Sequence, residues 1–402
     1  MPRHQHGLSR LYLLGGMGLG VWAYTIAPDL LSVLRFGTVG AVQLPTRYAL
    51  LACSGVGLIT GIWGMIAAPA SRLHTVRLGL NAGGLVCSIL IWASMGQRLE
   101  VLGLLAQSFR LATPIALGAL AGLLCERCGV VNIGIEGMML SAACLGFIVA
   151  LYTSNTWIGL GMAVLVGCVM AAVHAILAIH GGVDQIISST VLNIFAVGIT
   201  GFLRRAVLLQ NPRGAPAVFS TWPIPFVSDI PVLGQIFFRH QPLVYTTWLL
   251  VGVVHVLLFY TTWGLRTRAV GEYPRAADTL GIDVYTVRYG NVIASGILAG
   301  LAGAWFSLET VGTFDDMMTG GKGFIALAAM IFGKWKPCGA FGGALLFGFV
   351  DALQIKLQIV GVNVPYQLLG MMPYVVTMVV LAGFIGRAVP PAAVGQPYER
   401  EG

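Results

Sequence analysis

The segment Gly271–Leu308, GEYPRAADTLGIDVYTVRYGNVIASGILAGLAGAWFSL, joins a charged stretch to a long apolar one. Only 9% of the 402 residues are charged, yet the first half of this segment holds Glu272, Arg275, Asp278, Asp283 and Arg288. The second half is apolar and long enough to enter a bilayer as a helix. The segment therefore predicts a membrane helix that follows a polar connection at the membrane surface.

Composition extends this prediction to the whole chain. The residues are 57% hydrophobic and the mean hydropathy is +0.85, which is more than a soluble domain of this length needs to fill its core. The 54 glycines favour close contact between membrane helices, and Gly296, Gly300 and Gly303 are typical of such a contact. The net charge of +8 lies on connections without a basic stripe, so we expect membrane lipid and no nucleic acid as a partner.

Apolar runs predict an all-α integral membrane protein, a polytopic bundle of about 11 transmembrane helices. The runs lie at 11–28, 48–68, 78–96, 102–124, 131–151, 157–179, 186–208, 243–264, 289–311, 338–357 and 366–387. A shorter run at 324–333 predicts a broken or re-entrant segment that other parts of the protein bury. The basic N-terminal stretch lacks a convincing cleavage site, so we expect a retained first helix.

The distribution of Lys and Arg predicts the orientation. Alternation of the spans puts more basic residues on the side of the 271–290 connection, which favours that side as cytoplasmic, together with both termini. The connection 210–241 is then external, and its prolines exclude a continuous helix or a central strand. We expect an extended, ordered cap there, and no large soluble domain anywhere.

The polar connection itself predicts a short amphipathic helix. Pro274 suits a first helical turn and Gly281 suits a helix end. Ala276, Ala277 and Leu280 can share one face, which would suit docking in a groove of another protein. A solvated connecting loop explains the same residues on pattern alone.

Three stretches resemble bacterial ABC importer permeases of the branched-chain amino acid, simple sugar and nucleoside class. The first is Gly271–Leu308 itself. The second is ERCGVVNIGIEGMMLSA at 126–142, and the third is TGGKGFIALAAMIFGKWKPCGAFGGALLFGFVDALQIKLQ at 319–358. The ending PPAAVGQPY is also similar, so the resemblance covers about residues 100–400. The subgroup it resembles most is one of the two permeases of nucleoside importers that use a binding protein of the basic membrane protein family.

The resemblance implies the ABC importer permease fold and a separate energy source. The short polar helix would be the coupling helix that docks on the ATPase, and the matching positions are Gly271, Glu272, Pro274, Arg275, Ala276, Ala277, Asp278 and Gly281. Partners would be an ABC ATPase subunit, a sister permease and a periplasmic or lipoprotein substrate-binding protein. We expect no cofactor on this chain, because no phosphate-binding G-x4-G-K-[ST] loop occurs; ATP and Mg would bind the partner ATPase.

The resemblance also divides the chain into extra N-terminal helices at 1–100, a permease core at 101–389 and a cytoplasmic tail at 390–402. Within the core, Cys125 and Cys128 form a CxxC pair where the family commonly has serine. No second CxxC or histidine cluster completes a zinc site, so we expect no metal. Cys53, Cys87, Cys144 and Cys168 lie inside apolar runs and are expected to act as small hydrophobic residues.

Polar residues inside apolar runs are candidates for the translocation pathway, because ionisable groups in a bilayer usually face a cavity or a partner. The candidates are Asn132, Glu136, Thr190, Asn193, Asp351 and Gln354. Each has a structural alternative: Glu136 could accept backbone hydrogen bonds near a helix N-terminus, and the amides and hydroxyl could hold helices together. His174 and His255 are expected to pack in the core. Asp315, Asp316 and Lys322 are typical of a mobile external turn near the mouth of the pathway.

The resemblance implies a permease subunit that moves nucleosides across the bacterial inner membrane by alternating access. Simple sugars are the alternative substrate. An ion-coupled secondary transporter stays open because Glu136 and Asp351 could couple an ion. An enzyme is not expected, because the sequence offers no nucleophile with its base and no paired catalytic carboxylates.

Overall fold

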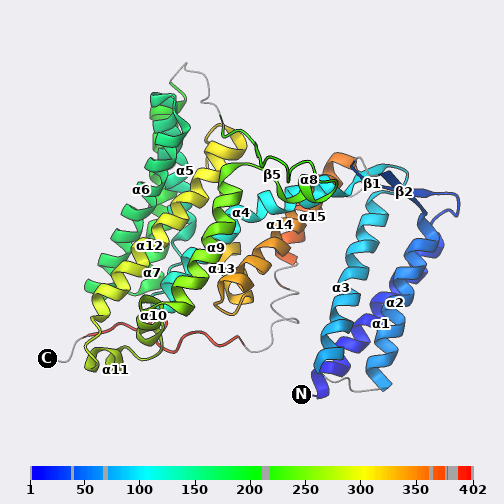
Figure 1. Ribbon diagram of the computed structural model, residues 1–402, viewed down its shortest axis with the longest axis horizontal. Coiled ribbons are helices and arrows are strands. Elements are labelled where there is room, and N and C mark those ends of the chain that lie inside the picture. Colours follow the sequence, from blue (N-terminus) through cyan, green and yellow to red (C-terminus); the bar gives the residue numbers. More distant parts are fainter. Residues whose placement is uncertain are drawn as a thin grey trace. The chain divides into compact units, whose positions relative to one another are not determined.

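The computed structural model describes residues 2–37, 40–66, 71–210, 218–361, 365–375, 378 and 388–399. It divides into two compact units (Figure 1). Unit 1 joins Met1–Leu105, Asp229–Ile236 and Ile355–Leu369, and unit 2 joins Ala106–Ser228, Phe237–Gln354 and Gly370–Gly402.

Unit 1 is built from three helices and a small sheet. Its elements are α1 (Pro2–Thr25), β1 (Leu31–Phe36), β2 (Gly40–Pro45), α2 (Thr46–Ile66), α3 (Ser71–Ala93) and β3 (Arg98–Glu100). The strand order is β2-β1-β3, with β1 antiparallel to β2 and parallel to β3. The hydroxyl of Ser54 donates to the carbonyl of Gly16 at 2.7 Å, which ties α2 to α1.

The sheet corrects the all-α prediction. Leu31–Phe36 follows the predicted span 11–28, and a strand of six residues is too short to be detected with a hydropathy window of about 20 residues. The chain turns after β1 at Gly37, where φ is +56°, a conformation that glycine adopts without strain. The buried hydroxyl of Ser32 then donates to the carbonyl of Ile91 at 2.7 Å, so the sheet is anchored on α3.

Unit 2 contains the larger core and most of the long helices. Its elements are α4 (Val101–Arg127, from Ala106 onward), α5 (Ile135–Thr153), α6 (Thr156–Ala175) with η1 (Ile176–His180), α7 (Gln185–Leu203) with η2 (Arg204–Leu208), β4 (Trp222–Pro223), β5 (Arg239–His240), α9 (Pro242–Tyr260), α10 (Thr262–Glu272), α11 (Pro274–Thr279), α12 (Val284–Ala304) with η3 (Trp305–Val311), α13 (Lys322–Phe332) and α14 (Pro337–Val360, up to Gln354). Two short helices, α8 (Leu233–Phe237) and α15 (Tyr366–Gly370), complete the described elements.

Glycine contacts set the packing of α6 against α12, as the sequence predicts. A Cβ atom on Gly167 would come within 2.2 Å of the carbonyl oxygen of Gly296, and one on Gly300 within 2.6 Å of that of Ala163. A Cβ atom on Gly303 would come within 2.2 Å of the carbonyl oxygen of Met139 on α5. The backbones of these three helices therefore approach as closely as small residues allow.

Within the described residues, eight helices are long and apolar enough to cross a bilayer. They are Thr46–Ile66, Val101–Arg127, Ile135–Thr153, Thr156–His180, Gln185–Leu208, Pro242–Tyr260, Val284–Val311 and Pro337–Val360. Each corresponds to a predicted span, but the predicted number of eleven is not confirmed. Helix α1 is not among the eight, the apolar part of α3 is shorter, and most of the predicted span 366–387 lies outside the described residues.

The short apolar run, for which a broken or re-entrant segment is predicted, forms a short helix. Helix α13 has 11 residues, too few for a span of about 20. The described part of the 210–241 connection, residues 218–241, contains no long helix: β4 and β5 pair with each other, and α8 has five residues. Pro212 and Pro216 lie outside the described residues.

Candidate functional site

The polar connection 271–281 forms the predicted helix. Helix α11 begins at Pro274 and ends at Thr279, and Gly281 follows with φ of +81°. The amide of Ile282 donates to the carbonyl of Ala277 at 3.1 Å across this turn, a pattern typical of a glycine-terminated helix. The next helix, α12, starts three residues after Gly281, and the Asp283 side chain accepts a hydrogen bond from the amide of Tyr285 as its N-cap.

The faces of α11 differ from the prediction at one position. Ala277 is buried and packs with Val270, Val284 and Tyr398, whereas Leu280 is 81% exposed and Tyr273 is 63% exposed. Leu280 therefore does not share the face of Ala277, because the helix ends at Thr279 and the chain turns there. Of the other predicted coupling residues, Ala276 and Asp278 are half-buried, while Glu272 and Arg275 are exposed.

Close backbone contact fixes the base of α11. A Cβ atom on Gly271 would lie 2.2 Å from the carbonyl oxygen of Arg127 at the end of α4. The Arg127 guanidinium donates from Nε and Nη2 to the carbonyl of Trp335, at 2.9 and 2.6 Å. The Trp335 indole donates to the Glu126 carboxylate at 2.6 Å. The connections between α10 and α11, α4 and α5, and α13 and α14 are thus joined at one end of unit 2.

Glu136 anchors the loop that leads into α13. Its Oε1 accepts the Thr319 hydroxyl at 2.6 Å and the Gly321 amide at 2.8 Å, and its Oε2 accepts the Gly323 amide at 2.6 Å. These amides are among the first of α13, which have no acceptor within the helix. The carboxylate therefore stabilises the N-terminus of α13 rather than that of its own helix.

Asp351 forms an ion pair with Lys322, the first residue of α13. The Asp351 side chain is 9% exposed and that of Lys322 is 21% exposed. Lys322 consequently belongs to the helix bundle and not to a solvated external turn, which corrects the prediction for this residue. Together with Glu136, the pair fixes α13 against α5 and α14.

The remaining pathway candidates do not converge on one cavity in the described residues. Asn193 of α7 accepts the Gly137 amide at 2.8 Å and donates to the carbonyl of Ile133 at 3.1 Å, so it joins α7 to α5. Asn132 is buried and accepts the Gly134 amide at 3.0 Å. Thr190 is exposed and donates within its own helix, and Gln354 is half-buried on α14.

His174 and the CxxC pair have structural contacts. The buried His174 ring contacts Val131 O at 2.9 Å and Ser188 Oγ at 3.1 Å. The Cys125 thiol donates to Ser295 Oγ at 3.0 Å, and the Cys128 thiol donates to Cys125 O at 3.0 Å. Burial raises the pKa of the Cys128 thiol, which disfavours the thiolate that metal binding requires. Among the described residues, no group of three His, Cys, Asp or Glu side chains could hold a metal ion.

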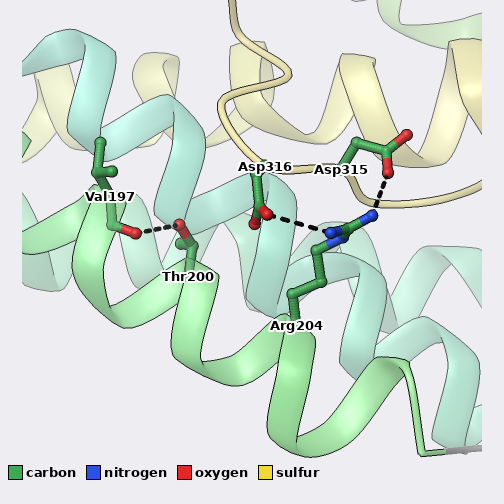
Figure 2. Close-up of polar contacts among 5 residues, drawn as sticks. All are labelled: Val197, Thr200, Arg204, Asp315 and Asp316. Atoms are coloured by element: carbon green, nitrogen blue, oxygen red, sulfur yellow. Dashed lines mark hydrogen bonds and ion pairs between the residues drawn. The ribbon is translucent and has the colours of Figure 1, made fainter.

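The structure adds an arginine that sequence reasoning did not single out. Arg204, at the end of α7, donates to Asp315 at 2.8 Å and to Asp316 at 3.1 Å (Figure 2). Both carboxylates lie in the loop between η3 and α13, so this loop is held by Arg204 near one end and by Glu136 near the other. Two adjacent arginines end an apolar segment at 204–205, and two adjacent aspartates lie at 315–316. These two charged pairs were the sequence signal from which the contact could have been predicted.

A pocket of about 350 Å³ opens beside this ion pair. It is lined by Val197, Gly198, Gly201, Arg205, Asp316 and Met317. Its volume is in the range of small-molecule sites, and it combines an apolar wall on α7 with one basic and one acidic residue.

Glu309 is a second residue that the sequence analysis left out. It is fully buried in η3, and its Oε2 accepts the Leu243 amide at 2.8 Å. Its own carbonyl accepts the Gln241 side chain at 2.8 Å. The acid thus joins η3 to the start of α9, and an isolated acid in an apolar run was the signal for it.

The eight long apolar helices among the described residues define a multi-pass membrane protein. Residues 104–385 match the model of the branched-chain amino acid transport system permease component family. The chain belongs to this family, and it is an ABC transporter permease subunit rather than an enzyme.

Curated relatives agree with this assignment. The chain is 40% identical over 299 residues to the guanosine ABC transporter permease protein NupQ of Bacillus subtilis, covering 71% of this chain and 93% of NupQ. It is 38% identical to the nucleoside ABC transporter permease protein NupC of Lactococcus lactis, over the same shares of the two chains. It is 37% identical to TsgC13 of Haloferax volcanii, provisionally described as a glucose ABC transporter permease, covering 74% of this chain and 98% of that one. No solved structure matches the chain.

Proposed function

We propose that this chain is the permease subunit of an ATP-driven importer of nucleosides, and that α11 is its coupling helix. The observation that carries the proposal is the geometry of α11. The helix is fixed at its base by Gly271 and Ala277, and it presents Tyr273, Arg275 and Leu280 outward. A rigid base under an exposed apolar tip suits docking in a groove of a partner.

The mechanism needs no covalent chemistry on this chain. ATP and Mg would bind the partner ATPase, whose closure would push on α11. Since only Leu280, Gly281, Ile282 and Asp283 separate α11 from α12, the push would reach the glycine contacts of α12 with α5 and α6. The helices would then shift between outward-open and inward-open states.

Nucleosides are the proposed substrate because two relatives that match most of their own length are nucleoside permeases. The likeness to a permease ascribed to glucose makes simple sugars the second candidate. Both substrates carry ribose-like or pyranose hydroxyls that side-chain carboxylates and amides bind. The pocket beside Arg205 and Asp316 is the proposed first contact on the outer side of the pathway.

The proposed orientation follows from the same assignment. Helix α11 and both termini would face the cytoplasm, and Arg204 with Asp315 and Asp316 would face outward. A sister permease would complete the pathway, and a periplasmic or lipoprotein binding protein would deliver the substrate. The candidates Thr190 and Gln354 would line the pathway, while Asn132, Glu136, Asn193 and Asp351 would hold its walls in place.

The test is uptake by cells that contain the complete importer. A radiolabelled nucleoside panel and a sugar panel are compared for the unchanged chain, Leu280→Asp and the conservative control Leu280→Met. We expect nucleoside uptake by the unchanged chain and the control, and loss of uptake with loss of the ATPase from purified Leu280→Asp complexes. If Leu280→Asp took up nucleosides as well as the unchanged chain does, the proposed role of α11 would be wrong. If the unchanged chain took up sugars alone, the substrate would be a sugar and not a nucleoside.

A further inference from the structure

The C-terminal segment 388–399 belongs to unit 2 and runs along α10 and α11 (Figure 1, red). The Ala393 amide donates to the carbonyl of Gly271 at 2.9 Å, and the Gly395 amide donates to the carbonyl of Gly129 at 3.1 Å. One short segment thus pairs its backbone with the base of α11 and with the connection between α4 and α5. We name residues 392–398 the C-terminal strap.

The strap covers a buried cation. Arg288 of α12 is 1% exposed, and its Nη1 donates to the carbonyl of Gln396 at 3.3 Å. Its guanidinium carbon lies 6.0 Å from the centre of the Tyr398 ring. Nε and Nη2 of Arg288 have no hydrogen-bond acceptor in the described residues. Since a buried charge is costly unless it is paired, the strap supplies an interaction that Arg288 requires.

Tyr398 joins the strap to the three elements around the coupling helix. The residue is 8% exposed and packs with Val270 of α10, Ala277 of α11 and Val284 of α12. Its carbonyl accepts the Tyr285 hydroxyl at 3.3 Å. The ring therefore lies under α11, in contact with the residues that would move when α11 moves.

We propose that the C-terminal strap is a coupling element, which passes displacement of α11 to the connection between α4 and α5 in parallel with the direct route into α12. This inference rests on the proposed docking role of α11. Filling an apolar gap would need only side-chain contact, whereas the strap also forms backbone hydrogen bonds at Gly271 and Gly129, which lie on different elements. From Gly129 the chain continues into α5, whose Glu136 holds the loop before α13. The strap would thereby connect the ATPase surface with the embedded helix.

The test measures coupling in the complete importer, reconstituted in vesicles with its ATPase, sister permease and binding protein. The variant is Tyr398→Ala, and the matched control is Glu399→Ala, the exposed next residue. We expect Tyr398→Ala to retain the ATPase in the complex and to hydrolyse ATP, but to transport several-fold less substrate per ATP than the control. An unchanged ratio of transport to hydrolysis would overturn the proposal. If Tyr398→Ala prevents assembly, Ala393→Pro, which removes the amide that donates to Gly271, is measured against the same two outcomes.

A second pair of variants separates coupling from stability. Removal of residues 392–402 leaves Arg288 without the carbonyl of Gln396, so we expect a lower temperature of thermal inactivation. Arg288→Met in the shortened chain removes the buried charge and should restore much of that stability. The ratio of transport to ATP hydrolysis should stay low, because the link from α11 to Gly129 is still missing. Full recovery of the ratio by Arg288→Met would show that the strap only caps Arg288, and would overturn the proposal.

The two proposals fail in different ways. If Leu280→Asp keeps the ATPase bound and transport intact, the docking role of α11 is wrong. If Leu280→Asp releases the ATPase while Tyr398→Ala couples normally, α11 docks as proposed and only the strap lacks a role in coupling.

Discussion

Helices α11 and α13 are both short, and unit 2 holds them in different ways. Helix α11 lies next to polar connections and is fixed by Gly271, Ala277 and backbone hydrogen bonds. Helix α13 lies among the long helices and is fixed by charged groups, Glu136 at its first amides and Asp351 at Lys322. The difference follows from the surroundings, because water can satisfy the ends of α11, whereas the amides at the start of an embedded helix need a partner from the protein.

The largest effect is expected when the carboxylate that caps α13 is removed. Glu136→Ala takes away the acceptor of the Thr319 hydroxyl and of two amides, and should destabilise the chain by on the order of 5 kcal/mol, since hydrogen bonds to charged groups contribute about 1.5–3 kcal/mol each. Thermal inactivation of the purified permease measures this loss. Glu136→Gln keeps the shape and one oxygen, so its loss should be smaller. Equal stability of Glu136→Ala and the unchanged chain would show that α13 is not held by this residue.

The ion pair of α13 should show a smaller, non-additive effect. Lys322→Met or Asp351→Leu alone leaves one charge without its partner and should cost about 2–4 kcal/mol. This is somewhat less than the roughly 3–5 kcal/mol for a fully enclosed pair, because Lys322 keeps some contact with solvent. The double variant removes both charges and should cost less than either single change. Stabilities of the four chains form a double-mutant cycle, and additive losses would contradict a direct interaction.

The anchor of α11 should respond to size and not to charge. Gly271→Ala places a Cβ atom against the carbonyl of Arg127, and overpacking of this kind costs about 1–3 kcal/mol. The matched control is Gly290→Ala, where a Cβ atom meets nothing within 4 Å. The temperature of thermal inactivation should be lower for Gly271→Ala and unchanged for Gly290→Ala. Equal temperatures for the two variants would mean that the backbone shifts to admit the Cβ atom without loss of stability.

The same contrast explains what the sequence could predict. Spans and the ends of α11 depend on residues close together in the chain, so hydropathy, Pro274 and Gly281 locate them. The partners of Glu136 lie more than 180 residues away, and no periodicity connects them. The prediction that Leu280 shares the face of Ala277 is wrong because it assumed that the helix continues past Thr279. The ending PPAAVGQPY is similar to that of the family, but the contacts of the strap were not predicted, because its bonds at Ala393 and Gly395 are made by the backbone, which carries no sequence signal.

The smallest effect is expected where the loop before α13 reaches the exposed end of α7. Arg204 is paired with Asp315 and Asp316, whose side chains are 61% and 47% exposed, and exposed pairs contribute about 0.2–1 kcal/mol. Arg204→Gln should therefore change stability by no more than this, and the difference from the unchanged chain should shrink further as salt screens the pair. Inactivation temperatures at low and high salt measure the loss of stability and its dependence on salt. Arg205→Gln is the control for the loss of a neighbouring charge. The contrast between exposed and embedded anchors would be contradicted if Arg204→Gln lost as much stability as Glu136→Ala, or if salt did not reduce the loss. Either result would show that the loop depends on its contact with Arg204 as much as on its contact with Glu136.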